Sequence, residues 1–132
     1  MEIVAVLVAA LAGFAVGAAW YMGLSRQWLA ATGIPLGPDG KPAVGSGSVL
    51  PFVVSGIAMI VVAGFMRHIF AMAGIDSPGK ALLSGLGVGA FFITPWVAMN
   101  YAYSGRKPML TVLDNGYAIL GCGAIGLVLG LF

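Results

Sequence analysis

"IVAVLVAALAGFAVGAAWYMGL", residues 3–24, is an unbroken apolar run without a charged side chain. As an α-helix its 22 residues would be about 33 Å long, enough to cross a hydrocarbon core of ~30 Å. A secretory signal peptide is a competing interpretation, but such a peptide has a basic start and a shorter apolar stretch. Glu2 precedes the run here, so we interpret residues 3–24 as a retained transmembrane helix.

The composition of the whole chain is that of a membrane protein. Of its 132 residues, 61% are hydrophobic and 8% are charged, whereas a soluble domain carries about 25% charged residues. The lipid bilayer is therefore the expected environment. The net charge of +2 is too small to indicate nucleic acid as a partner. The length favours one domain, residues 1–132.

Three further apolar runs complete the predicted fold. Spans are expected at about 49–73, 79–103 and 108–132, with a Gly- and Pro-rich loop at 33–48 and short turns elsewhere. Four spans return the chain to the side from which it started. The predicted fold class is therefore all-α, an integral membrane four-helix bundle with both termini on the same side.

Local signals predict how the third span begins and where it is distorted. Gly74 is expected to end the second span, and Asp76 or Ser77 to cap the third. Pro95 lies inside the third span, where it removes one backbone N–H. Membranes tolerate such a proline when neighbouring groups bind the freed carbonyl, so a kink is expected there.

Basic and aromatic residues gather on what we call the loop side, which holds the loops after the first and third spans. It carries four basic residues against two on the terminal side (Arg26, Lys41, Arg106 and Lys107 against Arg67 and Lys80). The positive-inside rule therefore favours a cytoplasmic loop side. All three Trp and all four Tyr also fall toward the loop side. An uneven interfacial belt and a binding surface are both open as explanations.

The two loop-side connections begin alike. "AAWYMGLSR" (18–26) and "AMNYAYSGR" (98–106) both run from small residues through aromatics to an arginine, which suggests a duplicated helical hairpin. The first helix is expected to continue past Arg26 and Trp28 along the membrane surface.

Glycines at helical spacing predict close helix packing. Small residues spaced four apart leave one stripe of a helix without bulky side chains, so that two helix backbones can approach closely. Packing inside one bundle and a dimerisation face are both open, and packing inside the bundle is favoured. The candidate packing residues are Gly13, Gly17, Gly85, Gly89, Gly126 and Gly130.

The sequence offers no catalytic set. Cys122 and His68 are its only cysteine and histidine, too few for a zinc site. No phosphate-binding glycine loop follows a strand. We interpret Cys122 as a small packing residue and His68 as an interfacial one, and we expect no metal, no cofactor and no enzymatic activity.

The stretch "MNYAYSGRKPMLTVLDNGYAILG", residues 99–121, places polar groups between two apolar segments. Asp114 would lie about 9 Å along the fourth span from Pro108, where a carboxylate needs a partner or water. We predict that Arg106 binds it, because a guanidinium can hold a carboxylate and an amide together. The candidate binding residues of this polar cluster are Asn100, Tyr101, Arg106, Asp114, Tyr117, Trp20 and Tyr21.

Three motifs carry a family resemblance: "GAAWYMGLSRQW", "NYAYSGRKP" and "DNGYAILGCGAIG". They resemble those of an uncharacterised family of small bacterial four-helix membrane proteins, the domain of unknown function seventeen sixty-one. The chain departs from the family pattern in its loop 34–48 and in Lys107, which separates the arginine from the proline. The resemblance implies the fold and a bacterial inner membrane, and it implies no activity. The matching residues are Trp20, Tyr21, Trp28, Gly33, Asn100, Tyr101, Arg106, Pro108, Gly116 and Tyr117.

Two functions stay open. The favoured one is a non-enzymatic accessory or scaffold protein that binds partner proteins or itself, with a homo-oligomer or a membrane-protein partner expected. The alternative is a small oligomeric transporter or channel with a polar site at the loop side. This alternative is supported by Asp114, Asn100 and the Thr94–Pro95 break. No charge lies near the middle of the first, third or fourth span, which disfavours an ion path.

Overall fold

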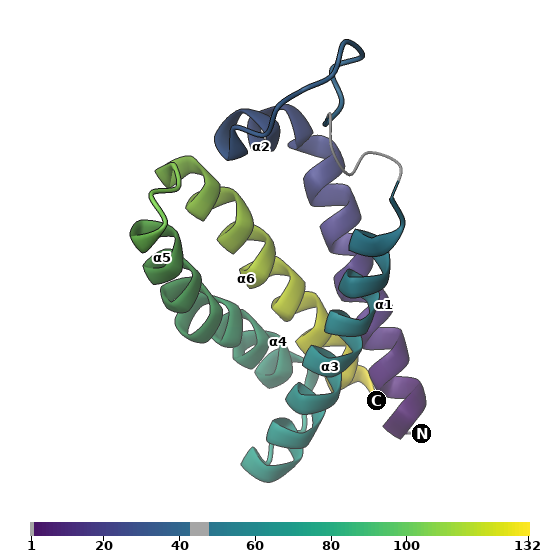
Figure 1. The fold of residues 1–132 in the computed structure, drawn as a ribbon. Coiled ribbons are helices and arrows are strands. Elements are labelled where there is room, and N and C mark those ends of the chain that lie inside the picture. The colour runs from purple at the N-terminus through teal and green to yellow at the C-terminus, as the bar shows by residue number, and fades with distance from the viewer. Residues whose placement is uncertain (1, 43–47) are drawn as a thin grey trace.

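The computed structural model describes residues 2–42 and 48–132, so positions 43–47 of the predicted loop 33–48 lie outside the described residues. Four of the described helices are long and apolar enough to cross a membrane. They are α1 (Glu2–Gly23), α3 (Leu50–Ala73), a composite third span (Pro78–Tyr103) and α6 (Pro108–Leu131). Both chain ends lie at one end of the molecule (Figure 1). The predicted all-α membrane fold is confirmed, and the protein is a multi-pass membrane protein.

The third span consists of three consecutive pieces: α4 (Pro78–Gly87), the π-helix η1 (Val88–Ile93) and α5 (Thr94–Tyr103). The wider π-helical turns directly precede Pro95, which has no N–H to donate to the preceding turn. The Thr94 hydroxyl donates to the Gly89 carbonyl at 2.7 Å. The distortion expected at Pro95 thus takes the form of a π-helix on its N-terminal side, and the Gly89 carbonyl accepts both the backbone N–H and the hydroxyl of Thr94.

The turn between α3 and the third span has the predicted caps. Gly74 has a φ of 69° and ends α3 in the left-handed conformation, which glycine adopts without strain. Of the two candidate N-caps, Ser77 is the one used: its hydroxyl accepts the Lys80 N–H at 3.3 Å. Asp76 binds the Lys80 ammonium at 3.2 Å instead.

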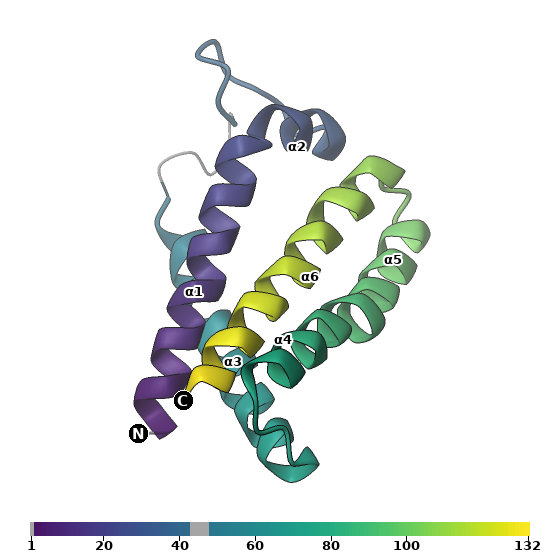
Figure 2. The same cartoon turned by 180° about the vertical axis from the view of Figure 1, so that it is seen from behind.

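A short helix, α2 (Ser25–Thr32), covers the loop-side end of the bundle (Figures 1 and 2). The chain bends at Leu24, so α2 is a separate surface helix and not a straight extension of α1. Lys107 donates to the Ala30 carbonyl at 3.2 Å, and that carbonyl is one of those that a helix end leaves without an internal partner. The turn before α6 therefore holds α2 across the end of the bundle.

Helix α6 is the centre of the fold. In both views it lies between α1 and the third span (Figures 1 and 2), and it is the most buried of the four spans. Helix α3 packs mainly on α1, with a smaller contact on α6, whereas the third span packs on α6. The described part of the bundle is therefore open between α3 and the third span.

Glycines allow the close contact between α6 and the third span. A Cβ at Gly85 would meet the Cys122 carbonyl, and a Cβ at Gly126 would meet the Ala81 carbonyl, each closer than 3.0 Å. Gly89 faces the backbone at Ala118 in the same way. The two backbones thus touch without intervening side chains, which maximises their van der Waals contact in the absence of a hydrophobic driving force.

The remaining predicted packing glycines also face another helix of the same chain. Gly130 lies against Pro78 at the start of α4. On α1, Gly13 accommodates the Ile125 side chain and Gly17 accommodates the Tyr117 ring. Every candidate packing glycine therefore contacts another helix of the same bundle.

An ion pair joins three spans at the terminal side. Arg67 of α3 donates to both Glu2 carboxylate oxygens, at 2.9 and 2.7 Å. It also donates to the Leu129 carbonyl at 3.1 Å, one of the last carbonyls of α6, which also accepts the Phe132 N–H at 3.3 Å. The sequence did not reveal this contact, because Glu2 and Arg67 are 65 residues apart.

Candidate functional site

Asp114 is the centre of a polar cluster at the loop side. Its Oδ1 accepts the Tyr21 hydroxyl at 2.8 Å and the Trp28 indole N–H at 3.1 Å. Its Oδ2 accepts the Tyr101 hydroxyl at 2.5 Å. The donors come from α1, α2 and α5, so one carboxylate on α6 connects four helices. We call Asp114 with these three donors the Asp114 cluster.

The prediction that Arg106 binds Asp114 is wrong. In the described part of the chain the ion pairs are Arg67–Glu2 and Lys80–Asp76, and Arg106 and Asn100 are both exposed. Arg106 follows the left-handed turn at Gly105, beyond the end of α5, where it is exposed. The stiff aromatic side chains reach inward and supply neutral donors in its place.

Tyr117 and Trp20 lie beside the cluster and tie α1 to α6. The Tyr117 hydroxyl donates to the Gly13 carbonyl at 2.9 Å, and its ring packs edge-on against Tyr21 at 5.5 Å. The Trp20 indole donates to the Leu113 carbonyl at 2.9 Å. Both residues thus support the site without binding the carboxylate of Asp114.

The two similar stretches of sequence meet at this carboxylate. Tyr21 and Tyr101 hold corresponding places in the stretches 18–26 and 98–106. They donate to different oxygens of Asp114, one from each helix that flanks α6 at the loop side. The repeated pattern therefore has a structural counterpart, a pair of tyrosines that hold one carboxylate from two sides.

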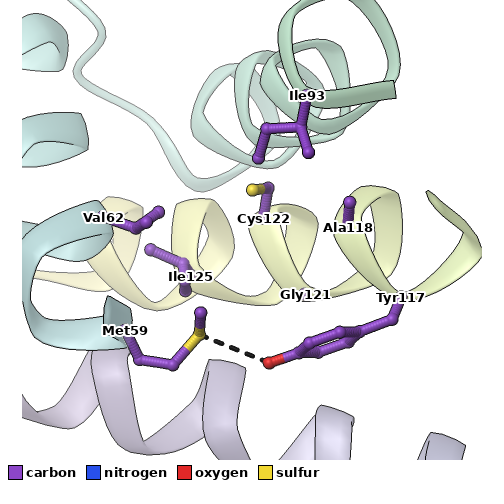
Figure 3. Close-up of a pocket in the computed structure, with 8 residues that line it drawn as sticks. All are labelled: Met59, Val62, Ile93, Tyr117, Ala118, Gly121, Cys122 and Ile125. Carbon is purple, nitrogen blue, oxygen red and sulfur yellow. Dashed lines mark hydrogen bonds between the residues drawn. The ribbon is translucent and has the colours of Figure 1, made fainter. Parts of the chain in front are cut away.

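An apolar cavity of about 220 Å³ begins one helical turn below Asp114. Figure 3 shows α3 and η1 on its sides and α6 along its length. Ala118, Gly121 and Ile125 of its lining follow Asp114 at i+4, i+7 and i+11, which places them on the same face of α6 as the carboxylate. The lining consists of Met59, Val62, Ile93, Tyr117, Ala118, Gly121, Cys122 and Ile125.

Comparison with known proteins identifies the family. A family model described as a protein of unknown function, DUF1761, matches residues 4–130. The chain belongs to the DUF1761 family. The family resemblance of the sequence motifs is thereby confirmed, and neither a curated protein nor a solved structure matches the chain.

Sequence reasoning about this DUF1761 chain missed two residues. Trp28 was expected in a surface extension and among the family-matching residues but not in the polar cluster, although the excess of aromatic residues at the loop side pointed to a role there. Asn115 went unnoticed beside Asp114: it is 4% exposed, and neither its amide nitrogen nor its oxygen has a hydrogen-bond partner among the described residues. With Cys122 and Gly126 it lies on the face of α6 that packs on the third span.

Replacing Asn115 with leucine should stabilise this DUF1761 protein by about 1 kcal/mol, because a buried amide without a partner carries an uncompensated desolvation cost. Leucine has a similar volume and no polar atom. The midpoint of unfolding in mixed micelles would measure the gain, with Asn100→Leu at an exposed position as the control. A lower midpoint for Asn115→Leu would show that the amide has a binding partner, and it would contradict this prediction.

Proposed function

We propose that this chain is a non-enzymatic accessory or scaffold protein of the bacterial inner membrane, and that it acts by binding a second copy of itself. The outer face of the third span is the proposed contact surface. The absence of an enzymatic role is supported by the single cysteine and the single histidine of the sequence. The bacterial inner membrane is supported by the family resemblance and by the excess of basic residues on the loop side.

An exposed aromatic stripe carries this proposal. Phe92, Trp96, Met99 and Tyr103 follow one another at i, i+4, i+7 and i+11, so they share one face of the third span. All four are exposed, with Trp96 at 67% and Tyr103 at 90%. Tyr, Trp, Phe and Met are the residue types enriched in the centres of protein interfaces.

The depth of Trp96 favours a protein contact over a lipid contact. Trp96 is seven residues before Tyr103, about 10 Å along the helix, whereas tryptophan normally sits at the membrane surface. Its indole N–H has no acceptor among lipid tails, where an unpaired donor is costly. A second copy supplies both an acceptor and the packing that the stripe lacks within the described chain.

Transport of a small ligand is the second candidate, and the Asp114 cluster favours it. Its carboxylate lies inside a membrane span, has no cation within 4.0 Å among the described residues, and has a cavity beneath it. An ionisable group inside a span is a functional candidate by default. The absence of charge near the middle of spans one, three and four still disfavours a complete ion path.

The double variant Phe92→Ala and Trp96→Ala tests the proposal. Single-molecule photobleaching of labelled protein in lipid bilayers counts the copies in each complex. We expect dimers for the unaltered protein and monomers for the double variant, since its interface would lose two aromatic anchors. Phe52→Ala on α3 is the matched control, because Phe52 is also 67% exposed, and it should stay dimeric. A monomeric unaltered protein over a range of densities would contradict self-association.

A further inference from the structure

We propose that the Asp114 cluster and the cavity below it form one binding site for an amphiphile with an ammonium head and an apolar tail. This inference does not rest on the self-association proposed above. It concerns Asp114 with its donors on α1, α2 and α5 and the cavity between α6, α3 and η1, not the outer face of the third span.

The first argument is charge. Asp114 accepts three hydrogen bonds, all from neutral donors, and no basic side chain of the described residues lies within 4.0 Å of it. The side chain is partly exposed, so a ligand can reach it. A carboxylate at this depth is stabilised by a cation, and the surrounding donors fix the direction in which its oxygens point.

The second argument is the aromatic surround, which selects an organic cation over a metal ion. Tyr21 packs edge-on against Trp28 at 6.1 Å and against Tyr117 at 5.5 Å, so three rings in different orientations lie together beside the carboxylate. Aromatic rings attract ammonium groups, above all quaternary ones, at their faces. Calcium and magnesium require several oxygen ligands, whereas the neighbours of Asp114 are hydroxyl and indole donors that point at it.

The third argument is the position and size of the cavity. It extends along α6 from Tyr117 to Ile125, about 12 Å, and it starts about one turn from the carboxylate. Its volume of about 220 Å³ cannot admit a helix, whose diameter is about 10–12 Å. A single apolar tail fits these dimensions, with its head at the level of the lipid headgroups.

Two sources share this chemistry: a membrane lipid with an amine headgroup and a free lipophilic amine. Decyltrimethylammonium is a suitable probe for both, because it joins a quaternary ammonium head to one apolar tail. Decanoate has a similar tail with the opposite charge, and decanol has one without charge. Titration of the full-length protein in a nonionic detergent by calorimetry compares the three compounds.

We expect saturable binding of decyltrimethylammonium and weaker or no binding of decanoate and decanol. Asp114→Asn, which keeps an acceptor oxygen for the aromatic donors, should weaken binding at least about tenfold, as expected for loss of a charge-assisted contact. Asp39→Asn, at a carboxylate in the loop after α2, is the matched control and should bind like the unaltered protein.

A second variant keeps the test decisive if Asp114→Asn fails to fold. Ala118→Leu leaves the Asp114 cluster intact and fills the upper part of the cavity, so it should weaken binding about threefold or more through lost tail contacts. Equal affinity of the unaltered protein for decyltrimethylammonium and decanoate would overturn the proposal, as would unchanged binding in both variants. Competition by phosphatidylethanolamine, but not by phosphatidylglycerol, would assign the site to a lipid amine. If phosphatidylethanolamine does not compete, the site would be assigned to a free lipophilic amine.

Discussion

Replacing Gly126 with leucine is expected to destabilise the protein by about 3 kcal/mol or more. A Cβ at this position would lie under 3.0 Å from the Ala81 carbonyl and close to the Gly85 backbone. Neither group is the end of a flexible side chain, so α6 and α4 would have to separate. The contact that is lost is the backbone-to-backbone packing on which helix association in lipid depends.

The matched control is Gly56→Leu on α3, where a Cβ would meet nothing within 4 Å. Both changes introduce the same side chain inside a helical span, so their difference isolates packing from helix propensity. Unfolding in micelles that contain increasing sodium dodecyl sulfate, followed by tryptophan fluorescence, measures both. Similar unfolding midpoints for the two variants would mean that Gly126 is not in a tight contact.

Replacing Asp114 with leucine is expected to cost about 3 kcal/mol of stability. The change removes the common acceptor of Tyr21, Trp28 and Tyr101, and each partly buried donor that loses its partner carries a cost of about 1–3 kcal/mol, reduced here by access to water. Helix α2 should loosen first, because Trp28 is its contact with the carboxylate. Faster amide hydrogen exchange in residues 25–32 would show this directly.

Two further variants separate the possible causes. Asp114→Asn should lose less stability than Asp114→Leu, because its remaining oxygen still accepts hydrogen bonds. Arg106→Ala should change stability by less than about 0.5 kcal/mol, since Arg106 is exposed and makes no ion pair with Asp114. A loss of stability for Arg106→Ala as large as that for Asp114→Leu would indicate that Arg106 does bind the Asp114 carboxylate.

The part of the fold that could be predicted rests on solvation and local backbone chemistry. Apolar runs long enough to cross a membrane must be helical, because lipid offers no hydrogen bonds to the backbone. The caps at Gly74 and Ser77 and the distortion before Pro95 follow from single residues and their immediate neighbours. Glycine spacing likewise indicated which faces of α1, the third span and α6 would lie close to another helix.

The partners of the polar residues could be predicted only in part. Asp114 was expected to need a partner from the energetics of its position alone, and a polar cluster surrounds it. The choice of Arg106 failed because it relied on proximity in sequence, whereas Tyr21 and Trp28 approach from 93 and 86 residues away. For the same reason, the Arg67–Glu2 pair and the burial of the Asn115 amide could not be predicted from neighbouring residues in the sequence.

Four membrane-spanning helices can be inferred from the order of residues alone, because hydropathy and helix length are sums over consecutive residues. The central position of α6, the fold of α2 across the loop-side end, and the binding of Asp114 by aromatic donors and not by an arginine appear only in the packed bundle. These features depend on which helix faces touch. In lipid that choice is made by close packing and by the few hydrogen bonds between helices, and both depend on residues that are far apart in the chain.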